Sequence, residues 1–204
     1  DELMIDHCIA ELTPASHLLL LNDQFGALSV GLHRFHCTVV NDSEVSNRAI
    51  QQNCQSNSLP CPRLLNSLES WPKTDTVLLR LTKNLGYLEH QLQQIAQLPN
   101  PVQVIAAGKT PLVTRSVIDL FEQYLDEVTT SLARKKSRLI FARHCHPKAI
   151  NWKFPIDVHW AQKNLTLMAH ANVFSKEQID IGGRFLAEHL PGVKSGQTVI
   201  DLGC

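Results

Sequence analysis

Short apolar segments alternate with amphipathic helical segments along most of this chain, and this alternation limits the folds open to it. Segments rich in Leu and β-branched residues have the length of buried strands at 17–21, 35–40, 76–81, 102–106 and 137–142. Helical patterns lie between them at 25–32, 43–54, 85–98 and 113–132. Strands that alternate with helices favour an α/β fold, with helices on both faces of a mostly parallel sheet. We therefore predict that residues 17–142 contain a complete α/β unit.

Size and composition limit the class of protein further. A chain of 204 residues with 44% hydrophobic content can hold one domain, or one domain and part of another. The longest apolar run, 18–21, is far shorter than a transmembrane helix, and no basic signal-peptide region is visible. We therefore expect no membrane partner.

The cysteines suggest a compartment but no metal site. None of the six cysteines forms a C-x-x-C pair, which favours free thiols in a reducing cytoplasm. His144, Cys145 and His146 are adjacent on a predicted strand, so their side chains alternate between its faces. No second ligand pair stands at a zinc-site spacing. We expect no bound metal.

Charge is unevenly distributed although the net charge is zero. Residues 1–133 hold 14 acids and 8 bases, whereas residues 134–204 hold 5 acids and 11 bases. The stretch 134–153 contains no acid and carries the candidate RNA-binding residues, namely Arg134, Lys135, Lys136, Arg138, Arg143, Lys148 and Lys153. Arg134, Lys135 and Lys136 would equally suit the C-terminal end of the predicted helix at 113–132, where cations offset the helix dipole.

The last third of the chain predicts a second α/β unit. Residues 147–172 contain two prolines and resemble a connector. Ser175 and Gln178 form a capping-box pattern, which predicts a helix over 176–190, and a strand follows at 198–201. Gly182 and Gly183 within that helix indicate a close approach, either to packed backbone or to a ligand.

Several motifs in this last segment together resemble a known family. They are His170-Ala-Asn-Val-Phe-Ser175, Ile179-Asp180-Ile181-Gly182 and Val199-Ile-Asp-Leu-Gly-Cys204. This combination resembles the ribosomal RNA guanine-N2 methyltransferases. The large-subunit (23S) branch is favoured and the small-subunit (16S) branch is the alternative. The chain starts at Asp1 and ends beside an Asp-Leu-Gly turn, so we expect it to be an N-terminal fragment.

The resemblance implies two Rossmann-like methyltransferase domains in one longer protein, of which only the second binds S-adenosylmethionine. It implies a degenerate copy over 1–146, a connector over 147–172 and the start of the catalytic domain over 173–204. In the parent, Phe174, Ser175, Asp180, Asp201 and Gly203 would bind the cofactor. The implied partners are ribosomal RNA and the protein's own C-terminal catalytic domain. No catalytic residue is assigned to this fragment.

A comparison within the chain supports the idea of a degenerate copy. When residues 199–204 are aligned with residues 20–25, Asn22 replaces the carboxylate and Gln24 replaces the glycine of the turn. A side chain in place of glycine fills space that a cofactor needs. The alternative, a stand-alone nucleotide-binding α/β enzyme, requires an intact glycine-rich turn. The nearest one, at 106–110, lacks the first glycine of a phosphate loop.

Overall fold

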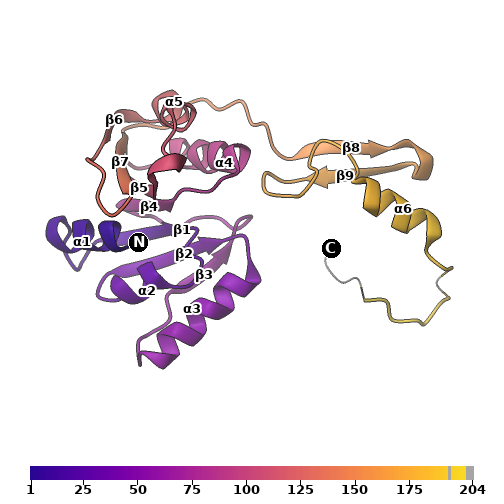
Figure 1. The fold of residues 1–204 in the computed structure, drawn as a ribbon, viewed down its shortest axis with the longest axis horizontal. Coiled ribbons are helices and arrows are strands. Elements are labelled where there is room, and N and C mark those ends of the chain that lie inside the picture. The colour runs from indigo at the N-terminus through magenta and orange to yellow at the C-terminus, as the bar shows by residue number, and fades with distance from the viewer. Residues whose placement is uncertain (193, 201–204) are drawn as a thin grey trace. The chain divides into compact units, whose positions relative to one another are not determined.

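The computed structural model describes residues 1–192 and 194–200. The chain forms two compact units, here called unit 1 (Asp1–Lys153) and unit 2 (Phe154–Cys204) (Figure 1). Each unit is described by itself.

Unit 1 is built on one seven-stranded sheet. Its strands are β1 (His17–Leu21), β2 (His36–Asn41), β3 (Arg63–Asn66), β4 (Thr76–Arg80), β5 (Val102–Lys109), β6 (Asp126–Thr130) and β7 (Ser137–His144). They lie in the order β3-β2-β1-β4-β5-β7-β6. The first five in this order pair in parallel, whereas β7 runs antiparallel to β5 and to β6. The prediction of a mostly parallel α/β sheet is confirmed.

Helices cover both faces of this sheet, as predicted (Figure 1). They are α1 (Glu2–Glu11), α2 (Ala27–Gly31), α3 (Glu44–Ser56), α4 (Leu85–Ala96) and α5 (Arg115–Tyr124), with a 3-10 turn η1 (Thr110–Leu112). Side chains alternate between the faces of a strand. Leu18 and Leu20 therefore join the core under α1 to α3, and Leu19 and Leu21 join the core under α4 and α5. This alternation gives the sheet two separate apolar layers.

Polar caps fix where several of these helices begin. The side chain of Ser43 accepts a hydrogen bond from the backbone N–H of Ser46 at the start of α3. Asn84 and Thr114 cap α4 and α5 in the same way. Each cap satisfies a backbone donor that the first helical turn leaves open. Helix α1 and strand β3 have no counterpart in the sequence prediction.

The predicted helix over 113–132 is wrong in its second half. Helix α5 ends at Tyr124, and the chain then enters β6, which contains the β-branched run Val128-Thr129-Thr130. Side chains branched at Cβ suit a strand better than a helix. Arg134, Lys135 and Lys136 therefore lie in the turn between β6 and β7, not at a helix end, and the helix-dipole explanation for them fails.

Unit 2 contains a hairpin and one helix. The hairpin consists of β8 (Ile156–Trp160), the 3-10 turn η2 (Ala161–Lys163) and β9 (Leu165–Ala169), and the helix is α6 (Ile181–His189). The segment 147–172 is thus not an irregular connector throughout. The helix begins later than predicted, because Asp180 is its N-cap and Ser175 lies in a preceding turn. Of the predicted strand at 198–201, residues 198–200 have no strand structure and Asp201 lies outside the described residues.

Candidate functional site

The carboxyl edge of the unit 1 sheet is the first place to look for a site. Strand β1 pairs with β2 on one side and with β4 on the other, so the chain order reverses beside β1. Open α/β sheets bind ligands outside the carboxyl ends of their strands at such a switch point. In unit 1 this edge carries the residues that follow β1 and β4.

Asn22 closes the edge between β1 and β4. Its Nδ2 donates to the carbonyl oxygen of Arg80 at 2.9 Å and to Oε1 of Gln91 at 3.1 Å. Its Oδ1 accepts a hydrogen bond from Nε2 of Gln91 at 3.0 Å. Gln91 belongs to α4 and is 1% exposed. The amide of Asn22 is therefore committed to joining β1, β4 and α4.

The next two side chains are also engaged within the protein. Asp23 is buried, and its carboxylate accepts from the backbone N–H of Ser29 at 2.9 Å and from its hydroxyl at 2.7 Å. Gln24 accepts from the guanidinium of Arg80 at 2.7 Å. That guanidinium also lies 3.5 Å from the carboxylate of Asp1. The carboxylate after β1 thus binds the first turn of α2.

The glycine left in this turn serves packing. Gly26 has φ of 81°, a left-handed conformation, and precedes α2. A Cβ atom here would lie 3.2 Å from Cα of Ile50 on α3. Gly26 is therefore required by the contact between α2 and α3. Gly108, in the segment 106–110, is likewise packed, since its Cβ would lie 2.8 Å from Cδ1 of Leu81.

A polar hollow of about 600 Å3 remains at this edge. Asn22, Gln24 and Arg80 line it together with side chains of both charges, which are Asp1, Glu2, Lys83, Lys109 and Lys135. The N-terminal residues of α1 therefore form part of its wall, a feature that the sequence did not predict.

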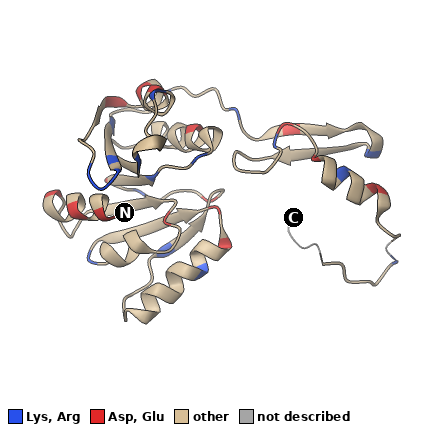
Figure 2. Ribbon diagram, viewed as in Figure 1, with Lys and Arg blue, Asp and Glu red and all other residues tan. Residues whose placement is uncertain are grey.

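The basic stretch is spread over unit 1 and largely ion-paired. At the hairpin tip Arg134 lies 3.3 Å from Asp6, and Lys135 contacts Glu2, both on α1. Figure 2 shows the acidic positions of α1 in red. The hydrogen bond from Lys135 holds the pKa of Glu2 below its usual value. Near the other end of β7, Arg143 lies 3.3 Å from Glu127, and beyond that end Lys148 lies 3.0 Å from Asp126. The length of β7 separates the two groups by roughly 20 Å.

The other three predicted RNA-binding residues have different surroundings. Nε of Arg138 donates to the carbonyl oxygen of Ser131 at 3.1 Å. Lys136 is exposed at the hairpin tip, and Lys153 is exposed at the end of unit 1. The structure thus groups Arg134, Lys135 and Lys136, with Arg138 close by on the same hairpin, and places Arg143, Lys148 and Lys153 further along the chain.

The cofactor-binding residues predicted in unit 2 are only partly described. Phe174 is 83% exposed, and the hydroxyl of Ser175 donates to the carbonyl oxygen of Gln178. Asp180 caps α6 by accepting from the N–H of Gly183 at 3.1 Å. A Cβ at Gly182 would lie 3.0 Å from Oδ2 of Asp180, so the close approach is to the helix's own cap. Asp201 and Gly203 lie outside the described residues.

The described part of the chain holds neither a metal-binding cluster nor a membrane-spanning helix. No three His, Cys, Asp or Glu side chains there gather closely enough to hold a metal ion. His144, one of the sequence candidates, is buried and donates from Nε2 to the carbonyl oxygen of Leu98. No helix there combines the length and apolar character needed to span a bilayer.

Comparison with known families decides the identity of unit 1. The family model described as "RLMG N-terminal domain" matches residues 1–147. The chain belongs to this family. A second model, "Methyltransferase small domain", matches residues 164–204.

Curated relatives carry one name. The chain is 40% identical to ribosomal RNA large subunit methyltransferase G of Pseudoalteromonas translucida, over all of this chain and 55% of the relative. It is 42% identical to the protein of that name from Psychromonas ingrahamii, over 95% of this chain and 52% of the relative. The chain thus spans about half the length of these relatives.

Solved structures agree on the fold. Magnesium protoporphyrin IX methyltransferase from Synechocystis PCC 6803 matches with a TM-score of 0.56 at 13% identity, over 70% of this chain and 77% of its own. Precorrin-6y C5,15-methyltransferase from Geobacter metallireducens matches with a TM-score of 0.55 at 9% identity, over 70% and 87%. Unit 1 thus has the Rossmann-like methyltransferase fold predicted from the sequence.

Proposed function

We propose that this chain is the N-terminal part of an S-adenosylmethionine-dependent methyltransferase that modifies N2 of a guanine in 23S ribosomal RNA. The name and identity of the relatives support the substrate, and the order of the two family matches supports the layout. Within it, unit 1 binds ribosomal RNA and supports the catalytic half, while methyl transfer belongs to the remainder of the protein. A ribosomal RNA substrate favours a cytoplasmic site of action.

The hydrogen bonds that engage the side chains at the carboxyl edge of unit 1 are the observation that carries this proposal. S-adenosylmethionine needs acceptors for its amino group and close backbone approach at a glycine-rich turn. In unit 1 the amide of Asn22 is bonded to Gln91 and Arg80, the carboxylate of Asp23 is bonded to Ser29, and Gln24 stands where a glycine is needed. These residues do not fit the cofactor, so unit 1 keeps the fold without the reaction.

Calorimetric titration of S-adenosylmethionine into the 1–204 chain tests this directly. We expect no binding heat at cofactor concentrations up to about 1 mM, which corresponds to a binding free energy weaker than about 4 kcal/mol. A dissociation constant in the micromolar range would show that an intact cofactor site is present, and the proposal for unit 1 would be wrong.

RNA binding by unit 1 is supported by the exposed cations of the hairpin tip. Arg134 and Lys135 remain 59% and 61% exposed despite their acidic partners. Exposed ion pairs contribute little free energy, so a phosphate can replace the carboxylate at small cost. We propose Arg134, Lys135, Lys136, Arg138, Arg143, Lys148 and Lys153 as RNA contacts, with the tip contributing most.

Cofactor contacts by Phe174, Ser175, Asp180, Asp201 and Gly203 are proposed for the longer protein only. The exposure of Phe174 supports this, because a large apolar side chain in solvent needs a further surface or a ligand to cover it. In a filter assay with tritiated S-adenosylmethionine and 23S rRNA, we expect the 1–204 chain to transfer no methyl group above background. Methyl transfer by this chain alone would contradict the proposal that the reaction belongs to the remainder of the protein.

A further inference from the structure

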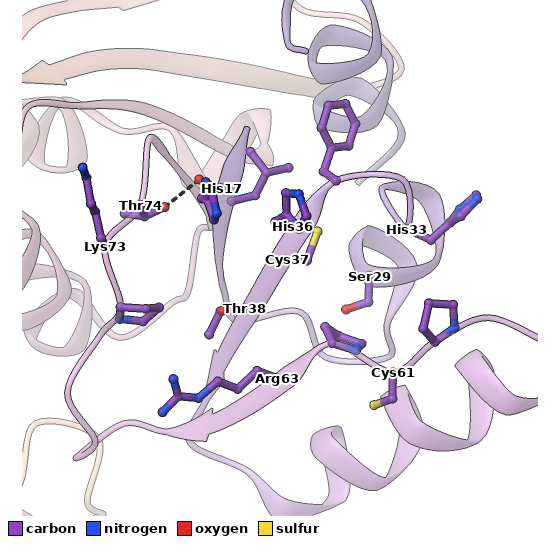
Figure 3. A pocket seen from close by; sticks show the side chains of 15 residues that line it. His17, Ser29, His33, His36, Cys37, Thr38, Cys61, Arg63, Lys73 and Thr74 are labelled. Atoms are coloured by element: carbon purple, nitrogen blue, oxygen red, sulfur yellow. Dashed lines mark hydrogen bonds between the residues drawn. The ribbon is translucent and has the colours of Figure 1, made fainter. Parts of the chain in front are cut away.

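A second cavity lies at the opposite, amino edge of the unit 1 sheet (Figure 3). It has a volume of about 320 Å3, within the range of small-ligand sites. The first residues of β1, β2 and β3 line it, together with the segment that leads into β4. Neither the family match nor the basic stretch accounts for it.

Strand register gathers its polar side chains on one face of the sheet. His17 of β1 is in register with His36 of β2, and Thr38 is in register with Arg63 of β3. Residues two apart on a strand share a face, so all four side chains lie on the same face across three neighbouring strands. The imidazoles of His17 and His36 are stacked, with centroids 5.0 Å apart and planes tilted by 20°. Lys73 approaches from the segment before β4 (Figure 3).

The acidic and basic side chains that line this cavity are two cations, Arg63 and Lys73. None of the described residues that line it is Asp or Glu, and neither Arg63 nor Lys73 has an ion-pair partner among the described residues. An acid next to the lining, Asp75, accepts from the backbone N–H of His17 at 2.9 Å and lies 3.3 Å from its Nδ1. These bonds hold the pKa of Asp75 below its usual value. Within the described part of the chain, Arg63 and Lys73 thus lack the direct ion pairs that four cations of the basic stretch make.

We propose that this amino-edge pocket binds a phosphate group of the RNA backbone, with the attached nucleoside on its wall; this rests on the proposed function. Arg63 offers a planar fork that matches phosphate oxygens, and Lys73 adds a point charge. The imidazole of His36 and the hydroxyl of Thr38 can supply further donors. Pro60, Pro62 and Pro72 form a rigid apolar wall for the sugar or base. The pocket would give unit 1 an RNA contact away from the hairpin tip.

Cys61 supplies a reporter at the pocket itself, because it is exposed and lines the cavity. The test measures the rate at which iodoacetamide alkylates Cys61 in the 1–204 chain, alone, with a 23S rRNA oligoribonucleotide, and with inorganic phosphate. We expect the oligoribonucleotide to slow Cys61 several-fold, and to slow it less in the double variant Arg63→Gln with Lys73→Gln. An unchanged Cys61 rate with the RNA bound would overturn the proposal and leave the proposed function standing. Protection by inorganic phosphate but not by RNA would also overturn it, by revealing a free-anion site.

A charge variant tests the same contact energetically. The double variant Arg63→Gln with Lys73→Gln should lower affinity for the oligoribonucleotide about tenfold and reduce the salt slope of binding by about 1 to 2. The control is Arg48→Gln with Arg115→Gln, which removes two exposed cations from α3 and α5. Thermal melting first confirms that both variants are folded. Equal losses in the two variants would show a long-range charge effect and contradict a specific pocket.

Discussion

At the scale of single residues, Asn22 decides what the carboxyl edge of unit 1 can do. Comparison within the sequence identified Asn22 and Gln24 as departures from a cofactor turn. It could not identify their partners, because Arg80 and Gln91 lie 58 and 69 positions further along the chain. Such contacts depend on sheet order, which a single sequence does not encode locally. The departures from a cofactor turn were therefore predictable, and the hydrogen bonds that Asn22 makes were not.

The variant Asn22→Asp tests this network. Aspartate tolerates the left-handed φ of 68°, so the backbone conformation is preserved. It cannot donate to the carbonyl oxygen of Arg80 or to Gln91, which leaves polar groups unpaired. We expect a loss of about 2 kcal/mol of unfolding free energy, measured by urea denaturation. The control Gln52→Glu adds the same charge on an exposed position of α3 and should cost less than about 0.5 kcal/mol. Equal effects would mean that Asn22 contributes no specific bonds.

Burial separates the cysteines by reactivity. It raises the pKa of Cys8 and of Cys37 to about 12, so at pH 8 almost none of either thiol is the reactive thiolate. Cys61 is exposed. In the folded chain we expect Cys61 to be alkylated at least tenfold faster than Cys8 or Cys37, by peptide mass spectrometry. Because the thiolate fraction rises with pH below the pKa, raising the pH should accelerate every site. Comparable rates in the native protein at pH 8 would contradict the buried positions.

At the scale of elements, the turn between β6 and β7 shows why the helix predicted over 113–132 was wrong in its second half. The apolar spacing from 113 to 132 fits a helix, yet the β-branched residues near its end favour a strand and the chain folds back as a hairpin. Arg134 and Ser137 exchange backbone hydrogen bonds of 2.9 and 3.0 Å around the two-residue turn. Lys135 and Lys136 there have φ of 50° and 59°. Two left-handed residues define a type I′ turn, which normally prefers Asn-Gly, so Lys-Lys carries no turn signal.

Replacing Lys135-Lys136 by Asn-Gly should therefore stabilise the chain. Relief of two left-handed L-residues outweighs loss of the exposed pair between Lys135 and Glu2, with a net gain of about 1 kcal/mol. For a unit of this size, that gain raises the melting temperature by roughly 3 °C. The matched control Lys135→Ala with Lys136→Ala removes the same charges but keeps the left-handed strain. Equal or greater stabilisation in the alanine variant would show that charge, not turn geometry, limits stability here.

At the scale of the whole molecule, the fold was largely predictable and the distribution of its charges was not. Alternating strand and helix patterns were sufficient for a mostly parallel sheet with two helical layers. They did not show that β7 runs antiparallel to β5, nor that α1 brings acids against the hairpin tip. In the same way, the run 134–153 is continuous in sequence, but β7 divides it into separate groups. The amino-edge pocket could not be predicted from the sequence, because its residues lie far apart in the chain and meet only through strand register.

We propose that unit 1, which has a methyltransferase fold, binds ribosomal RNA through its cations. The most direct measurement is the affinity of the 1–204 chain for a fluorescent 23S rRNA fragment, by anisotropy, from about 50 to about 200 mM salt. With roughly four phosphate contacts, the account predicts that the association constant falls about a hundredfold, linearly on a double logarithmic plot. The triple change of Arg134, Lys135 and Lys136 to Gln should flatten that slope. No detectable binding at low salt, or binding that is independent of salt, would contradict the account.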